Sequence, residues 1–195
     1  MYKVGITGGI GSGKSTIARI FESIGIPVYY ADKEAKRLMN KNPSLKQAIK
    51  LLLSNEAYHK NGRLNRKYIA ERVFKDKALL AQLNNLVHPA VRYDFESWAE
   101  RQENSYVLKE SALIFEIKGQ SYFDATILVI ADKETRIERI IKRDKSNRKA
   151  VIDRMNNQLS DEIKIPLADH IVSNNGVNSL IEQVLKIHRK LIKYI

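Results

Sequence analysis

The chain has 195 residues, of which 44% are apolar and 29% charged, and it contains no cysteine. This length and composition allow a buried core in one compact domain, and the lack of cysteine excludes disulfides, thiolate metal sites and a thiol nucleophile. The formal charge of +12 fits nucleic acid, a membrane surface or a small polyanionic substrate. Residues 136–149 hold seven Lys/Arg against two Asp/Glu, which favours a local anion site; the other basic residues are interpreted as solvated charge on helix faces.

A glycine-rich segment follows the first predicted strand. Residues 2–7 favour a strand, residues 8–15 match the pattern Gly, any four residues, Gly-Lys-Ser/Thr, and apolar residues at helical spacing then continue to Gly25. This order predicts a phosphate-binding loop, in which backbone N–H groups surround the phosphates, Lys14 reaches the β and γ phosphates, and the Ser15 hydroxyl ligates magnesium. The loop residues predicted to bind ATP are Gly11, Ser12, Gly13, Lys14, Ser15 and Thr16.

A second strand over residues 26–30 ends just before Asp32. Ligands bind at the carboxyl ends of strands in open parallel sheets, so Asp32 is a candidate site residue; the alternative is that it caps the next helix. Residues 33–103 look wholly helical and are too long for one crossover, so we expect a helical subdomain beside the sheet. Pro89 is expected to open a new helix, and His88 by itself favours a structural role.

Three further strands, over residues 106–110, 124–131 and 168–172, complete a parallel sheet. Asp132 is interpreted as the N-cap of an amphipathic helix rather than as a magnesium ligand. The apolar face of that helix is expected to hold Ile137, Ile140 and Ile141, and the other side Arg136, Arg139 and Arg143. A polar turn over residues 144–149 is interpreted as a mobile flap, and a last amphipathic helix is capped by Asn178 or Ser179.

A phosphate loop alone is shared by GTPases, larger ATPases and small kinases. The Asp-x-x-Gly motif of the common GTPases is absent, and residues 40–43 lack the final Asp of Asn-Lys-x-Asp. A small kinase needs an acceptor pocket, a group near the acceptor hydroxyl, and cations that close over the transferred phosphoryl group. The helical insertion, Asp32 and the basic segment 136–149 are candidates for these three parts.

Several short segments follow one another along the chain in an informative order. They are residues 5–15, Tyr30-Ala31-Asp32, His88-Pro89, Leu113-Ile114-Phe115-Glu116, Arg139 to Asp144, Arg154 to Gln158, and residues 168–176. In this order they resemble the dephospho-coenzyme A kinase family, nearly from end to end. Two positions depart from the family pattern: Tyr30 stands where Asp is frequent, and residues 110–112 replace Asp-Val-Pro, which leaves Glu110 either near magnesium or structural.

The resemblance implies ATP-dependent phosphorylation of the ribose 3′-hydroxyl of dephospho-coenzyme A, giving coenzyme A and ADP in the last step of coenzyme A synthesis. It also implies an α/β P-loop NTPase fold, with a nucleoside-monophosphate-kinase-like parallel sheet flanked by helices, a helical acceptor-binding part and a lid. The expected core covers about residues 1–32, 104–137 and 160–195, the acceptor-binding part about 33–103, and the lid about 138–159.

The resemblance also assigns roles to single residues. Asp32 would orient or deprotonate the acceptor hydroxyl, Lys14 and Arg143 would act on the phosphates, and Arg136 is expected to matter less than Arg143. The remaining expected ligands are Arg139 and Asn174 for ATP, Thr7, Asp32 and His88 for the acceptor, and Ser15 for Mg²⁺.

Two alternatives stay open at this stage. One is a small kinase of the same fold acting on a nucleotide or a shikimate-like metabolite, and the other is a nucleic-acid-binding ATPase, suggested only by the charge of +12. The favoured interpretation expects ATP and dephospho-coenzyme A as small-molecule partners, with no nucleic acid and no membrane. The absence of a basic leader and of a long apolar run predicts a cytoplasmic protein; the oligomeric state is left open, with a monomer favoured.

Overall fold

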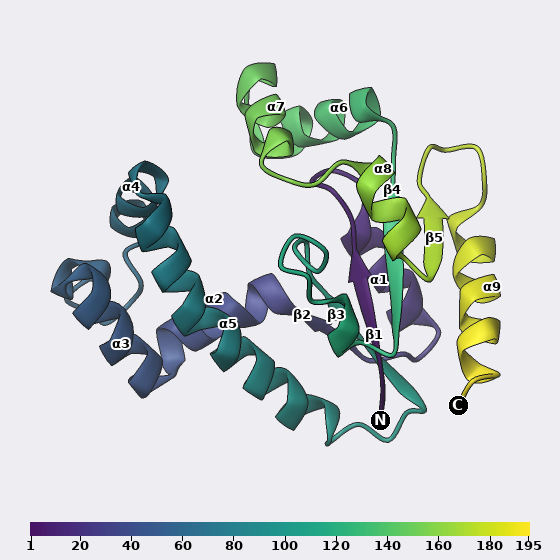
Figure 1. The fold of residues 1–195 in the computed structure, drawn as a ribbon, viewed down its shortest axis with the longest axis horizontal. Helices are drawn as coiled ribbons and strands as arrows, with labels where there is room; N and C mark the ends of the chain where they lie inside the picture. The colour runs from purple at the N-terminus through teal and green to yellow at the C-terminus, as the bar shows by residue number, and fades with distance from the viewer. The chain divides into compact units, whose positions relative to one another are not determined.

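The computed structural model describes the backbone of residues 1–195 and the side chains of all of them except residues 74 and 75. The chain divides into two compact units, the first formed by residues 1–30 and 102–195 and the second by residues 31–101. Figure 1 shows the elements of both units. No helix in the described part of the chain has both the length and the apolar character that crossing a membrane requires.

A parallel sheet with the strand order β2-β3-β1-β4-β5 forms the centre of the first unit (Figure 1). Its strands are β1 (Tyr2–Thr7), β2 (Val28–Tyr30), β3 (Tyr106–Glu110), β4 (Ala125–Ile130) and β5 (His170–Ser173). The middle strand β1 is paired on both edges, since Val4 lies opposite Leu108 on one side and Ala125 on the other. The predicted strands and their parallel arrangement are confirmed.

Helices α1 and α9 pack against this sheet. The helices of the first unit are α1 (Lys14–Ser23), α6 (Lys133–Asp144), α7 (Arg148–Asn156), α8 (Asp161–Lys164) and α9 (Leu180–Ile192), with short 3₁₀ turns η2 (Gln120–Tyr122) and η3 (Ile165–Leu167). Phe21 of α1 and Leu191 of α9 are fully buried in the same apolar core as Ile6 of β1. The ends of both helices follow the sequence prediction: Gly25 closes α1 with φ +87°, and the Ser179 side chain accepts a hydrogen bond at the start of α9.

The second unit is helical, as predicted, apart from one small hairpin. Its helices are α2 (Ala31–Lys41), α3 (Pro43–Leu53), α4 (Arg66–Lys75) and α5 (Lys77–Ala99), with the 3₁₀ turn η1 (Asn55–Ala57). An isolated antiparallel bridge joins Tyr58 to Leu64 between η1 and α4. The Asn65 side chain then accepts a hydrogen bond from the Tyr68 N–H, which caps α4.

The expectation that Pro89 starts a new helix is wrong, because α5 continues through it. A proline inside a helix removes one backbone hydrogen bond and costs about 3 kcal/mol. One face of α5 is buried before and after the proline: Leu83, Val87, Val91 and Phe95 are each at most 7% exposed. Burying each such side chain contributes about 1.5–3 kcal/mol, so the continuous apolar face outweighs the local preference of proline.

Candidate active site

The glycine-rich loop lies between β1 and α1, at the carboxyl end of the central strand. Gly11 and Gly13 have φ values of +80° and +96°, a region that glycine enters at little cost. Gly13 also needs its missing side chain for space, because a Cβ there would lie 2.1 Å from Asn174 Nδ2. The loop closes on itself through a hydrogen bond of 3.1 Å from the Ser12 N–H to the Gly9 carbonyl.

Helix α1 begins at Lys14 with Gly13 as its N-cap, and no side chain caps it within the described residues. The first N–H groups of a helix lack intrahelical partners and lie at the positive end of the helix dipole, so this end is suited to an anion. Lys14 Nζ donates to the Gly8 and Gly9 carbonyls at 2.9 and 3.4 Å, which folds its ammonium over the loop. Ser15 and Thr16 are exposed in the first turn.

Two side chains from late in the sequence hold the peptide groups of Ile10 in the loop. Gln158 Oε1 accepts a 2.7 Å hydrogen bond from the Ile10 N–H, and Arg136 Nε donates a 3.0 Å hydrogen bond to the Ile10 carbonyl. Arg136 is only 7% exposed and is also ion-paired with Asp161, at 3.2 Å. Its guanidinium lies directly against the loop, since a Cβ on Gly9 would come within 2.0 Å of Arg136 Nη2.

The expected placement of Arg136 on the solvent side of its helix is therefore wrong. Position 136 directly precedes the buried Ile137, and the long side chain reaches the loop carbonyl, which accepts its hydrogen bond, and Asp161, which neutralises its charge. Sequence reasoning gave Gln158 no role beyond its family motif. No local pattern signals either contact, because both depend on the loop lying beside α6 and the residues that follow α7.

Arg139 and Asn174, both expected at the ATP site, also contact the loop. Arg139 donates to the Gly11 carbonyl at 3.5 Å and to the Asn174 backbone carbonyl at 3.1 Å. Asn174 Nδ2 donates a 2.8 Å hydrogen bond to the Ser12 carbonyl. The structure thus brings both residues to the loop.

Arg143 lies one turn further along α6 and is exposed. It donates two hydrogen bonds to Asp144, which also accepts one from Arg154 of α7. The hydrogen bond from Arg143, supported by that from Arg154, lowers the pKa of Asp144 to about 2. This carboxylate stays ionised near neutral pH and holds the two arginines together at the α6–α7 corner.

Helix α7 starts sooner than the sequence indicated. The predicted flap over residues 144–149 reduces to the short connection between Asp144 and Arg148, and Val151 of α7 packs on Ile137 and Ile140. Asp132 occupies the N-cap position of α6 as predicted, but it makes no capping hydrogen bond among the described residues. Its carboxylate instead accepts from Asn175 at 3.1 Å.

Asp32 and His88 belong to the second unit, whereas Thr7 belongs to the first. Asp32 lies within the first turn of α2, exposed, so it is not the N-cap of that helix. His88 lies within α5. Thr7 ends β1 and is fully buried, and its hydroxyl has no hydrogen-bond partner among the described residues.

Glu110 at the end of β3 and Glu116 in the loop after it have different surroundings. Glu110 ends β3 and lies opposite Ile6 in the register of the sheet, so its backbone neighbours the strand that leads into the loop. Glu116 is ion-paired at 2.6 Å with Lys164, which is fully buried, although the two groups are not aligned as a hydrogen bond. Breaking a buried ion pair typically costs about 3–5 kcal/mol, so Glu116 has a structural role here.

The residues present are compatible with magnesium bound mainly through nucleotide phosphates. In the described part of the chain, no three His, Cys, Asp or Glu residues are grouped closely enough to hold a metal by themselves. Mg²⁺ usually keeps several waters and takes one or two protein ligands beside the phosphates of its nucleotide. The exposed Ser15 hydroxyl at the start of α1 suits such a site.

A glycine-rich loop between a parallel strand and a helix, with arginines of a later helix against it, defines a P-loop protein of the small-kinase class. The chain belongs to the dephospho-CoA kinase family, because a family model with that description matches residues 2–179. A curated relative from Salinibacter ruber, named dephospho-CoA kinase, is 41% identical over 179 residues that cover 90% of each chain.

Solved structures agree with this assignment. The crystal structure of TT1252 from Thermus thermophilus matches with a TM-score of 0.87 at 33% identity, covering 97% of this chain and 96% of the other. The dephospho-CoA kinase from Campylobacter jejuni matches with a TM-score of 0.71 at 28% identity, covering 98% of each chain. The expected family and fold class are thereby confirmed.

Arg136 provides a test of how far the loop depends on its neighbours. Arg136→Ala removes the hydrogen bond to the Ile10 carbonyl and leaves Asp161 without its cation, so we expect a loss of about 1–3 kcal/mol in the free energy of unfolding. We also expect weaker ATP binding and a loss of about 10–100-fold in kcat/KM, because small displacements of a binding group are costly. Denaturant unfolding, calorimetry with ATP and steady-state kinetics would measure these effects.

Lys133→Ala is the matched control, because Lys133 is an exposed cation of the same helix and lies outside the segment assigned to the lid. It is expected to change neither ATP affinity nor turnover. If Arg136→Ala lowered only the stability and kept the ATP affinity of the unaltered chain, the residue would support the fold and not the loop.

Proposed function

We propose that this chain transfers the γ-phosphoryl group of ATP to the ribose 3′-hydroxyl of dephospho-CoA, giving CoA and ADP in the last step of CoA biosynthesis. The observation that carries the proposal is the family match, which spans the phosphate loop, the helical second unit and the helices α6 and α7. The relative from Salinibacter ruber and the solved protein from Campylobacter jejuni both carry the name of this activity.

The loop would bind the phosphates of ATP. Its N–H groups and the amino end of α1 provide fixed partial positive charge, and Lys14 would exchange the Gly8 and Gly9 carbonyls for phosphate oxygens. Arg139 and Asn174 would complete this site from α6 and the end of β5. Bound magnesium would neutralise charge on the β and γ phosphates, and Ser15 is its proposed ligand.

The second unit would bind the acceptor. We assign residues 33–103 to acceptor binding and residues 138–159 to the lid, with Thr7, Asp32 and His88 as acceptor ligands. Asp32 is an exposed carboxylate whose side chain has no partner among the described residues, so it is free to accept a hydrogen bond from a hydroxyl. In this role it would orient the 3′-hydroxyl and take its proton during transfer.

The central experiment measures ADP formation from ATP with and without dephospho-CoA. We expect ADP to form rapidly only when dephospho-CoA is present, and mass spectrometry to detect CoA in equal amount. Lys14→Ala should retain its fold and lose orders of magnitude in turnover, because it removes the cation at the β and γ phosphates. Faster ADP formation with a nucleoside monophosphate or with shikimate would contradict the proposed acceptor.

Asp32→Asn tests the acceptor-side role. The amide keeps the size of the side chain but cannot accept a proton, so we expect kcat to fall strongly while calorimetry shows nearly unchanged ATP affinity. Asp153→Asn, an exposed carboxylate of α7, is a suitable control with the same chemical change. Parallel losses of ATP binding and turnover in Asp32→Asn would make Asp32 a nucleotide ligand instead.

Substitutions of Arg143 test the proposed role of this residue in the lid. In closing over ATP, Arg143 would leave Asp144 for the transferred phosphoryl group, where one arginine can be worth about 10³-fold or more in rate. Since exposed ion pairs contribute about 0.2–1 kcal/mol at most, Arg143→Ala should lower kcat strongly and leave Tm almost unchanged. Arg143→Lys should recover only part of the rate, because an ammonium group cannot donate bidentately.

Arg148→Ala is the control for this variant, because Arg148 is an exposed arginine of α7 that is ion-paired with Glu134. Equal and small changes in kcat for the variants at positions 143 and 148 would reduce Arg143 to surface charge.

A further inference from the structure

Positive charge is concentrated in one part of the second unit. Residues 36–67 contain nine Lys or Arg and a single acidic residue, Glu56. Along the sequence these cations are spread over three helices and a loop, which suggests ordinary solvated charge. The fold instead brings several of them around one pocket.

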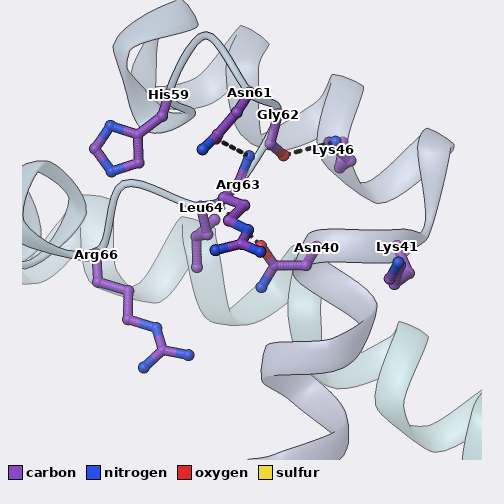
Figure 2. A pocket seen from close by; sticks show the side chains of 9 residues that line it. All are labelled: Asn40, Lys41, Lys46, His59, Asn61, Gly62, Arg63, Leu64 and Arg66. Carbon is purple, nitrogen blue, oxygen red and sulfur yellow. Dashed lines mark hydrogen bonds between the residues drawn. The ribbon is translucent and has the colours of Figure 1, made fainter.

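This basic pocket has a volume of about 870 Å³ and lies entirely within the second unit. Its walls come from the end of α2, the start of α3, the hairpin after η1 and the start of α4 (Figure 2). The lining residues are Asn40, Lys41, Lys46, His59, Asn61, Gly62, Arg63, Leu64 and Arg66. They include four Lys or Arg, one histidine and two amides, and none is acidic.

The hairpin that forms one wall is fixed to the helices on both sides. Lys46 Nζ donates a 2.9 Å hydrogen bond to the Gly62 carbonyl, and Asn40 Oδ1 accepts a 2.9 Å hydrogen bond from the Leu64 N–H. Tyr58, at the base of the hairpin, donates its hydroxyl to the Met39 carbonyl at 2.8 Å. These hydrogen bonds fix one wall of the pocket, which lowers the entropy cost of binding.

Besides Lys46, the pocket has three Lys and Arg side chains, and described residues do not neutralise them. The side chains of Lys41, Arg63 and Arg66 make no hydrogen bond or ion pair with any described residue, and Figure 2 shows Arg63 extending toward Asn40. Arg37, on the same helix as Lys41, behaves differently because it is ion-paired with Asp94 and Glu34. The unit thus pairs an arginine outside the pocket and leaves those that line it available.

We propose that the basic pocket binds a small anion that carries a diphosphate or a longer phosphate chain. Guanidinium groups bind phosphate oxygens bidentately, and several cations around one concave site suit more than one phosphate. The volume falls within the range of sites for ligands of drug size, so the pocket has room for an organic part beside the phosphates. The phosphates belong either to the acceptor or to a separate phosphorylated compound; the inference does not depend on the proposed reaction.

The test is a titration of the full chain with inorganic pyrophosphate at fixed ionic strength, followed by amide NMR. The N–H signals of Gly62 and Arg63 report on the pocket, and those of Gly11 and Gly13 report separately on the phosphate loop. We expect a saturable shift of the pocket signals. In the double variant Arg63→Ala, Arg66→Ala the dissociation constant at the pocket should rise on the order of tenfold or more, since hydrogen bonds to charged groups are lost.

The matched control is the double variant Lys60→Ala, Lys67→Ala. It removes two positive charges from the same hairpin and helix, but neither residue lines the pocket. We expect less than about a twofold change in its dissociation constant, because neither side chain lines the pocket and exposed charges are screened by salt. The absence of a saturable shift at Gly62, or an equal weakening in both double variants, would overturn the proposal. Thermal unfolding of each variant checks that it folds.

A kinetic arm identifies the source of the phosphates. If they belong to the acceptor, dephospho-CoA displaces pyrophosphate from the pocket, and the variant at positions 63 and 66 raises the KM for dephospho-CoA but not that for ATP. If they belong to another compound, both KM values stay unchanged while pyrophosphate binding is still lost. Failure of the proposed function would instead appear as missing ADP formation in the unaltered chain, whatever the pocket signals show.

Discussion

The phosphate loop depends on the two hydrogen bonds by which Arg136 and Gln158 hold the peptide groups of Ile10, here called the clamp on Ile10. A loop with several glycines gains access to positive φ angles, but it also loses more conformational entropy when it becomes ordered. Arg136 and Gln158 each bond one polar group of the Ile10 peptides, and so restrict the conformation of the loop. Anion binding at the amino end of α1 requires N–H groups that already point at the ligand, and this clamp supplies that preorganisation.

The same clamp connects the loop to the segment that would close over ATP. Arg136 lies on α6, as do Arg139 and Arg143, and Gln158 follows α7. Arg136 and Arg139 are bonded to carbonyls of the loop, whereas Arg143 is bonded to Asp144 at the far end of the helix. The helix is thus anchored near its start and carries its exposed cation near its end. A movement of that end would leave the phosphate loop in place.

The sequence was sufficient for the parts of the fold whose signal is local. Strand runs, the glycine pattern, Gly25 and Ser179 each depend on neighbours within a few residues, and the structure agrees with all four. Pro89 was misjudged because its own helix-breaking preference is outweighed by apolar burial along the whole of α5. Propensity describes one residue, whereas the buried face belongs to the tertiary structure.

The candidate site was predictable only in part, for the same reason. The loop residues follow from one motif, and Arg139 and Asn174 were expected beside them from the family resemblance. The partners of Arg136 and Gln158 lie more than a hundred residues away in sequence, on the loop itself, so no spacing rule points to them. The basic pocket was missed because its cations come from separate helices and a hairpin, and their convergence exists only in the folded unit.

The order of the strands has a consequence for how the chain matures during synthesis. Val4 of the central strand pairs with Leu108 and Ala125, so the strand that carries the phosphate loop emerges from the ribosome long before either neighbour exists. Contacts between such distant segments form slowly, because a long loop must close first. The second unit, by contrast, is continuous in sequence and can become compact before β3 and β4, the partners of β1, have been synthesised. A nascent chain that stops before α6 would hold the whole glycine motif and still lack the side chains that give it its shape.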